Sequence, residues 1–257
     1  DMPSSLKFAL KLVLGLALIA AIWTFIATQW GWKALPEPPA PMVSVFDTRF
    51  DAAGREAADR LDAMRHSHGV PGVTAAVAID GELVWAAGAG WADVGTETLA
   101  TPDTVFRIGS TSKAMTATVI ARLVDQGVLD PDGPVGESFP DAPNEDWLEI
   151  ELDQLLSHTA GFPGYENNSD WPDAYETLRM KRQYETVEES LGLVDDARLL
   201  SEPGEAFYYT SFDVVVAAVM AERSSGLDYA SLLEREIRAP LNLTCLLYTS
   251  DAADDLT

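Results

Sequence analysis

Two apolar runs joined by a two-residue turn constrain the fold of this chain more than any other feature of its sequence. Residues 73–90, VTAAVAIDGELVWAAGAG, read as two strands that meet at Asp80-Gly81. Asp-Gly is a strong signal for a tight hairpin, because the favoured turn needs positive φ angles that these two residues adopt readily. Strands joined in this way are antiparallel neighbours. The chain is therefore expected to contain an antiparallel sheet.

Helical patterns precede and follow this hairpin. Residues 49–65 carry apolar side chains at helical spacing, namely Phe50, Ala53, Ala57, Leu61 and Met64. A second helix is expected after Ser110, with an apolar stripe formed by Met115, Val119, Ile120, Leu123 and Val124. Gly127 lies near its expected end. Helices on both sides of a hairpin predict an α+β fold, in which helices pack on an antiparallel sheet.

Composition limits the classes of partner. The chain has 257 residues, of which 47% are hydrophobic, so it can form one large domain or two small ones with a sizeable core. The formal net charge is −24, from 41 acidic and 17 basic residues, which argues against a nucleic-acid partner. Cys245 is the single cysteine and excludes an internal disulfide.

An apolar run stands near the N-terminus. Residues 12–27, LVLGLALIAAIWTFIA, are about long enough to cross a bilayer. Lys7 and Lys11 precede the run and two tryptophans follow it, as expected for a helix whose N-terminus stays inside. We therefore predict a single-pass transmembrane anchor over residues 6–28, with the remaining chain on the periplasmic or extracytoplasmic side. A cleaved signal peptide is the alternative, although no small-x-small cleavage site follows the run.

A proline-rich segment follows the predicted anchor. PEPPAP, residues 36–41, has four prolines in six positions and is typical of an extended, semi-rigid spacer. We predict a linker over residues 33–48 and a globular domain over residues 49–244.

The segment FRIGSTSKAMTA, residues 106–117, combines serines and a lysine at a helix start. Residues three apart lie on one face of a helix, so Lys113 can place its amine beside the Ser110 hydroxyl. A serine hydroxyl needs such a nearby base to act as a nucleophile. Serine is also common at N-caps, and Ser-x-x-Lys recurs at Ser4 and Lys7. The segment alone leaves both interpretations open. The chain has neither a Gly-x-Ser-x-Gly elbow nor a phosphate-binding loop.

Three further stretches extend the pattern in a fixed order. They are LLSHTAGFPGY at 155–165, PGEAFYYTSFDVVVAAVMAERSSG at 203–226 and LLEREIRAPLNLT at 232–244. Together with FRIGSTSKAMTA and the hairpin, they resemble the serine β-lactamase and penicillin-binding-protein superfamily, in its class C-like branch. The resemblance spans about residues 69–244. It implies an α+β fold of the β-lactamase/transpeptidase type, with an antiparallel sheet flanked by helices and a helical subdomain.

The resemblance also implies roles for individual residues. Ser110 would be the acyl-accepting nucleophile, Lys113 its proton partner, and Tyr209 a general base and acid whose phenol carries the proton. Without this context, Tyr209 reads better as a core aromatic before a helix. Ser211 occupies the position of an asparagine that helps to hold a β-lactam amide, and a hydroxyl cannot offer both amide groups. Ser211 is therefore an auxiliary substrate-binding candidate, and β-lactam hydrolysis is less expected.

The segment YYTSF, residues 208–212, is more similar to the tyrosine segment of the membrane-associated mitochondrial β-lactamase-like proteins and their bacterial relatives. Those proteins resemble peptidases. The expected function is a serine hydrolase that forms an acyl-enzyme on Ser110, with a peptide, amide or other small-molecule substrate. An esterase is the near alternative, followed by a β-lactamase or D-Ala-D-Ala carboxypeptidase. A non-enzymatic binding or filament scaffold is the alternative from another class. No cofactor is implied, because Ser, Lys and Tyr suffice for the chemistry.

Three other polar groups have plain interpretations. His66 and His68 read as the polar end of a helix rather than as metal ligands, because no further ligand cluster follows at metal-site spacing. Thus no metal site is expected. His158 reads as a structural residue that braces its turn through hydrogen bonds. Residues 165–167, Tyr-Glu-Asn, match the Tyr-x-Asn motif literally but lack its surroundings, and read as a surface loop.

The C-terminal end departs from the superfamily pattern. The superfamily's third motif, Lys-Thr-Gly or His-x-Gly on a strand beside the serine, does not occur, and the chain ends 17 residues after Pro240. Residues 245–257, CLLYTSDAADDLT, read as a non-native tail. We expect the fold to be incomplete at the C-terminus. We also expect this chain by itself to be inactive, because one oxyanion-hole donor alone is worth about 10²–10³ in rate.

Overall fold

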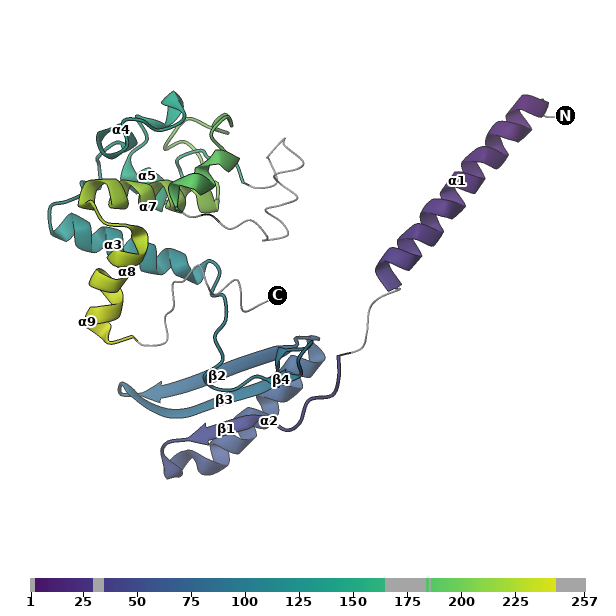
Figure 1. Ribbon diagram of the computed structural model, residues 1–257, viewed down its shortest axis with the longest axis horizontal. Coiled ribbons are helices and arrows are strands. Elements are labelled where there is room, and N and C mark those ends of the chain that lie inside the picture. Colours follow the sequence, from purple (N-terminus) through teal and green to yellow (C-terminus); the bar gives the residue numbers. More distant parts are fainter. Residues whose placement is uncertain (1–2, 30–34, 165–183, 185, 244–257) are drawn as a thin grey trace. The chain divides into compact units, whose positions relative to one another are not determined.

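The computed structural model describes residues 3–29, 35–164, 184 and 186–243 (Figure 1). The chain divides into two compact units, Asp1–Phe106 and Arg107–Thr257. The literal Tyr-x-Asn match at 165–167 and the expected tail at 245–257 lie outside the described residues. The architecture is α+β, as predicted, with one antiparallel sheet and many helices.

The first unit begins with helix α1 (Ser4–Gln29). Within the described part of the chain, no helix is both long enough and apolar enough to cross a membrane.

The sheet of the first unit is built around the predicted hairpin. Its strands are β1 (Met42–Val45), β2 (Gly72–Ile79), β3 (Glu82–Asp93) and β4 (Thr98–Leu99). β3 pairs with all three others, every pair is antiparallel, and the order is β1-β3-β2. Asp80 and Gly81 have φ angles of 52° and 86°, and the flanking residues Ile79 and Glu82 are paired. These angles confirm the two-residue hairpin. The segment predicted as linker, residues 33–48, includes β1.

Helix α2 (Asp51–Ser67), which follows the short helix η1 (Thr48–Phe50), packs on this sheet. Its existence was predicted, but the predicted buried face was partly wrong. Ala53 and Met64 are exposed, whereas Gly54 and Ala58 are buried. The cause is Trp85 of β3, whose indole Nε1 donates a 2.9 Å hydrogen bond to the carbonyl oxygen of Gly54. A Cβ at position 54 would lie 2.7 Å from Cδ1 of Trp85, so the helix approaches this strand closely at its glycine.

The second unit is helical in its described residues. Its elements are α3 (Thr111–Asp125), α4 (Val135–Ser138), η2 (Glu145–Trp147), α5 (Leu152–Leu156), η4 (Glu188–Leu193), α7 (Ser211–Ser225), α8 (Tyr229–Leu233), η5 (Glu234–Arg238) and α9 (Ala239–Leu241). Helix α7 contacts α3, α4, α5, α8 and η4, and Figure 1 shows it between α3 and α5. Its residues from Val216 to Ala221 are all buried, so α7 is the centre of this core.

Helix α3 follows the prediction closely. Val119, Ile120 and Leu123 are buried in the core, and Met115 and Val124 pack against it while partly exposed. The helix ends before Gly127, whose φ of 70° suits a glycine after a helix end. Since α3 packs on α7, the sequence segments at the beginnings of these two helices can meet.

Candidate active site

Ser110 stands immediately before α3 in the position of an N-cap. Serine at this position usually accepts a hydrogen bond from a backbone N–H one turn later. Here the backbone of Ser110 is already helical, with φ −65° and ψ −6°, and its side chain makes no capping bond. The hydroxyl oxygen instead accepts hydrogen bonds from two other side chains, Lys113 and Tyr209. The capping interpretation therefore does not account for the hydroxyl, and the hydroxyl faces groups that can move a proton.

Lys113 links the first turns of two helices. Its Nζ donates to the Oγ of Ser110 at 3.2 Å and to the Oγ of Ser211 at 3.0 Å. The first contact follows from the three-residue spacing on α3, as the sequence predicted. The second joins residues 98 positions apart in the chain and depends on the packing of α3 on α7. The ammonium also lies 5.2 Å from the centroid of the Tyr209 ring.

Tyr209 stands two residues before α7 and is not a core aromatic. Its side chain is 52% exposed, and its hydroxyl donates to the Oγ of Ser110 at 2.9 Å. The hydrogen bond with Ser110, followed by that with Lys113, holds the pKa of the Tyr209 phenol below its usual value. Both groups favour the phenolate, which would accept a proton from Ser110. The arrangement thus suits a general base beside a nucleophile.

The backbone around Tyr209 is fixed by Thr210, the N-cap of α7. The Thr210 hydroxyl oxygen accepts a 3.3 Å hydrogen bond from the backbone N–H of Phe212. The same hydroxyl donates to the carbonyl oxygen of Pro163 at 3.1 Å. Thr210 is buried, so this link is protected from water. It ties the start of α7 to the turn after α5. The positions of Tyr209 and Ser211, on either side of Thr210, are set by the same cap.

His158 lies in that turn and contacts Tyr209. Its φ is 59°, and its carbonyl oxygen accepts the backbone N–H of Tyr208 at 2.8 Å. Its ring centroid lies 4.7 Å from that of Tyr209 and 6.0 Å from that of Phe207. Nδ1 of His158 lies 2.8 Å from Oδ2 of Asp213, a residue in the first turn of α7.

Sequence reasoning did not single out Asp213. An acidic residue in the first turn of a helix is ordinary, because it complements the helix dipole. Asp213 is instead completely buried, and burial raises the pKa of its carboxyl to about 8, an increase that the positive charge of Lys113 opposes. Burial, and then the charge of Lys113, lowers the pKa of His158. Each shift favours the neutral form of its own group, the protonated carboxyl of Asp213 and the uncharged imidazole of His158. No local signal could have identified a pair 55 residues apart.

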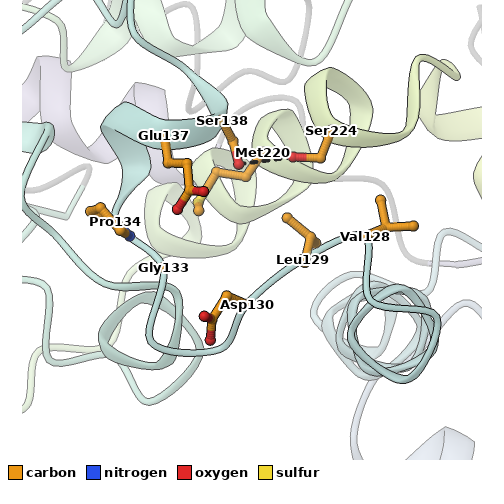
Figure 2. A pocket seen from close by; sticks show the side chains of 9 residues that line it. All are labelled: Val128, Leu129, Asp130, Gly133, Pro134, Glu137, Ser138, Met220 and Ser224. Atoms are coloured by element: carbon orange, nitrogen blue, oxygen red, sulfur yellow. Dashed lines mark hydrogen bonds between the residues drawn. The ribbon is translucent and has the colours of Figure 1, made fainter.

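A cavity of about 260 Å3 lies elsewhere in the second unit, between the segment after α3, helix α4 and helix α7 (Figure 2). Figure 2 shows Met220 and Ser224 of α7 beside Ser138, whose hydroxyl oxygen accepts a 2.8 Å hydrogen bond from that of Ser224. The lining includes neither Ser110 nor Tyr209. We therefore assign this cavity no part in the chemistry.

Histidines and acids do not form a metal site where the chain is described. No group of three or more His, Cys, Asp or Glu side chains in these residues could hold a metal ion. His66 lies in the last turn of α2 and His68 is its C-cap, with Nδ1 of His68 2.9 Å from the carbonyl oxygen of Met64.

Three known proteins place this geometry in context. The human serine β-lactamase-like protein LACTB, mitochondrial, is 26% identical in an alignment that covers 78% of this chain and 47% of the human protein. The D-amino acid amidase of Ochrobactrum anthropi SV3 superposes with a TM-score of 0.60 at 27% identity, covering 72% of this chain and 48% of the amidase. The octameric penicillin-binding protein homologue of Pyrococcus abyssi gives a TM-score of 0.64 at 24% identity, covering 77% of this chain and 45% of that one.

These relatives share the fold and differ in length. The chain spans about half the length of the proteins that it matches. The Beta-lactamase family matches residues 57–257, which is well over half of the chain. The protein is therefore a member of the Beta-lactamase family.

Proposed function

We propose that the protein is a serine hydrolase that forms an acyl-enzyme on Ser110. One observation carries the proposal: the Ser110 hydroxyl is not used as a helix cap and lies within hydrogen-bonding distance of both Lys113 and Tyr209. Tyr209 in its phenolate form takes the Ser110 proton as the serine oxygen attacks a carbonyl carbon. The same phenol then returns the proton to the leaving group, and water releases the acyl group in a second step.

Lys113 serves this reaction electrostatically. Its Nζ lies 3.2 Å from the Ser110 oxygen, and hydrogen bonding to Lys113 contributes to the lowered pKa of the Tyr209 phenol. A positive charge at this position favours both the phenolate and the negative charge that develops on the serine oxygen during attack. The start of α3 adds the partial positive charge of a helix N-terminus. Ser110, Lys113 and Tyr209 thus form the proposed catalytic set.

We propose a peptide or another amide as the substrate. The Ochrobactrum anthropi relative is a D-amino acid amidase, which supports amide chemistry on this fold. Ser211 is the proposed auxiliary residue, because its hydroxyl accepts a hydrogen bond from Lys113 and lies at the start of α7. A side chain in this position can contact the part of the substrate next to the scissile carbonyl.

An esterase is the second candidate, and Ser211 is the observation that favours it. An asparagine side chain can pair with both the N–H and the carbonyl of a substrate amide, which one hydroxyl cannot do at once, whereas an ester has no N–H group to satisfy. Comparing hydrolysis of a D-phenylalanine anilide with that of the matching ester distinguishes the two. An amidase cleaves both, whereas an esterase leaves the anilide intact.

A fluorophosphonate probe tests the proposal on the full-length protein. We expect covalent labelling of the wild type and its loss in Ser110→Ala. Ser112→Ala is the matched control, because this neighbouring hydroxyl donates to the carbonyl oxygen of Gly109 rather than to the catalytic set. It should label as the wild type does. Labelling that persists in Ser110→Ala would show that another residue is the nucleophile. A folded wild type that reacts with neither a fluorophosphonate nor a penicillin would favour the scaffold alternative.

Two expectations from the sequence stay predictions. The first is the anchor over residues 6–28, with the domain 49–244 on the extracytoplasmic side, which carbonate extraction and protease protection of whole cells would check. The second is that this chain by itself is inactive. The probe above, applied to residues 1–257 alone and to the full-length protein, measures that difference directly.

A further inference from the structure

Tyr209 is aligned on Ser110 although its side chain is half exposed. Its hydroxyl lies 2.9 Å from the serine oxygen, yet 52% of its surface is accessible to solvent. An exposed side chain retains rotamer freedom unless a neighbour restricts it. The ring of His158 is such a neighbour, with its centroid 4.7 Å from the Tyr209 ring and tilted by 56°. The imidazole therefore limits where the phenol can point.

His158 is itself held from two sides. Its φ of 59° lies in the left-handed region, which residues other than glycine adopt at a cost. Such a conformation persists when surrounding contacts determine it. Here the backbone of Tyr208 donates to the His158 carbonyl oxygen at 2.8 Å, and the side chain of Asp213 lies 2.8 Å from Nδ1. The first contact restrains the backbone of His158, and the second restrains the plane of the imidazole that faces Tyr209.

Burying the carboxyl of Asp213 has a free-energy cost, and its position in the first turn of α7 does not explain why an acidic residue is buried there. Its side chain is completely buried, and Oδ1 has no hydrogen-bond partner among the described residues. A buried polar atom without a partner is unfavourable, and an apolar side chain here would avoid the penalty. What Asp213 provides is the contact of Oδ2 with His158. Its burial among the apolar residues of α7 makes that contact rigid.

We propose that His158 and Asp213 form a positioning pair that holds the phenol of Tyr209 against Ser110. Asp213 orients the imidazole, and the imidazole ring orients Tyr209. Neither residue touches the reacting atoms, so both act through Tyr209. The inference rests on the proposed function of Ser110 and Tyr209, and it goes beyond it by assigning a role to residues outside the proposed catalytic set.

The competing interpretation is that the pair only fastens the turn after α5 to α7. Thr210 already makes such a link through its hydrogen bond to Pro163. A fastening role needs the hydrogen bond between residues 158 and 213 but not an aromatic ring at 158. A positioning role needs both. His158→Gln separates the two, because an amide can keep a hydrogen bond to Asp213 and has no ring to face Tyr209.

The first measurement is the rate of fluorophosphonate labelling of the full-length protein. We expect His158→Gln and His158→Ala to slow labelling by about 10- to 100-fold, since small misplacements of catalytic groups cost up to about 100-fold. Asp213→Asn should stay within about threefold of the wild type, because its amide can donate to Nδ1. Thr159→Ala, in the same turn but without contact to Tyr209, should match the wild type. Wild-type rates in folded His158→Gln would overturn the proposal.

The second measurement does not depend on activity. An ultraviolet titration of tyrosinate, with Tyr209→Phe as the reference, isolates the Tyr209 phenol. In the wild type its pKa lies below the usual value, chiefly through the hydrogen bond with Ser110, with Lys113 as the facing charge. We expect His158→Gln to move this pKa back toward the usual value. If it does not, the positioning role is wrong. If the wild type fails to label but this shift occurs, the proposed function fails and the positioning role stands.

Discussion

At the scale of single residues, Ser110 differs from a capping serine in what its hydroxyl contacts. It accepts from Lys113 at 3.2 Å and from Tyr209 at 2.9 Å. Of these contacts, only the first could be expected from local spacing. The second joins residues 99 positions apart, and the resemblance to known hydrolases, rather than periodicity, indicated it. Asp213 shows the limit of both approaches, because its importance depends on burial that only the packed structure reveals.

Removing the Tyr209 hydroxyl tests its role as base. We predict that Tyr209→Phe slows fluorophosphonate labelling by about 100-fold or more, as expected when a general base is lost. The fold should be unaffected, because the side chain is half exposed. Labelling stopped at a series of times measures the rate, and thermal unfolding of the same samples measures the stability of the fold. Tyr208→Phe is the control and should label normally. Equal rates for the two variants would contradict the assignment.

Restoring the amide at position 211 tests the expectation about β-lactams. In Ser211→Asn, the side-chain oxygen can keep the contact with Lys113, while the amide N–H provides a hydrogen-bond donor for a substrate carbonyl. We predict acylation by a fluorescent penicillin about tenfold faster than in the wild type, the effect of roughly one added hydrogen bond. Unchanged penicillin labelling, with fluorophosphonate labelling intact, would show that residue 211 does not limit β-lactam acylation.

At the scale of elements, local signals predicted which elements form better than they predicted how those elements pack. The Asp80-Gly81 hairpin and the apolar stripe of α3 depend on local geometry and appear as expected. The buried face of α2 differs from the prediction, because the ring of Trp85 lies so close to the helix that it leaves room for Gly54 but not for a larger residue. Packing partners from other elements determine which residues of a helix are buried, and a single helix sequence does not contain them.

Gly54→Ala tests that packing. Alanine in a helix is usually more stable than glycine by about 1 kcal/mol. Here an added Cβ would lie 2.7 Å from Cδ1 of Trp85, which is nearly buried and hydrogen-bonded to the same residue. We predict a net loss of about 1–3 kcal/mol in the free energy of unfolding, as for overpacked cores. Denaturant unfolding measures it, and Ala53→Gly, on the exposed face, reports the propensity effect alone. A stabilised Gly54→Ala would contradict the close contact.

At the scale of the whole molecule, the described site lies within one compact unit. The residues of the proposed site, from Ser110 to Asp213, belong to the unit Arg107–Thr257. The packing of α3 against α7 brings them together, with the turn after α5 as the third component. This assembly explains why a sequence can indicate Ser110 and Lys113 by spacing but needs the fold to place Tyr209, His158 and Asp213 around them.

The buried carboxyl of Asp213 makes global stability depend on pH. Its folded pKa, about 8, is raised above the ordinary value by burial, so its stabilising contribution is complete below the unfolded pKa and is lost as pH rises through about 8. Asp213→Asn removes the pH dependence of stability that is due to this carboxyl and leaves the part that is due to His158. We predict that thermal unfolding shows Asp213→Asn gaining stability relative to the wild type between pH ~5 and ~8. A constant difference across this range would mean that the carboxyl is already ionised in the folded protein.

The site of covalent attachment is the most direct measurement. Trypsin cleavage after Arg107 and Lys113 releases the peptide IGSTSK, residues 108–113, which contains Ser110 and Ser112 together. Fragmentation of this peptide by tandem mass spectrometry, after reaction of the full-length protein with a fluorophosphonate or a penicillin, assigns the adduct to one hydroxyl. We predict that all of the added mass lies on Ser110 and disappears in Tyr209→Phe under limiting reaction times. An adduct on Ser112, or on a residue outside this peptide, would contradict the assignment of Ser110 as the nucleophile.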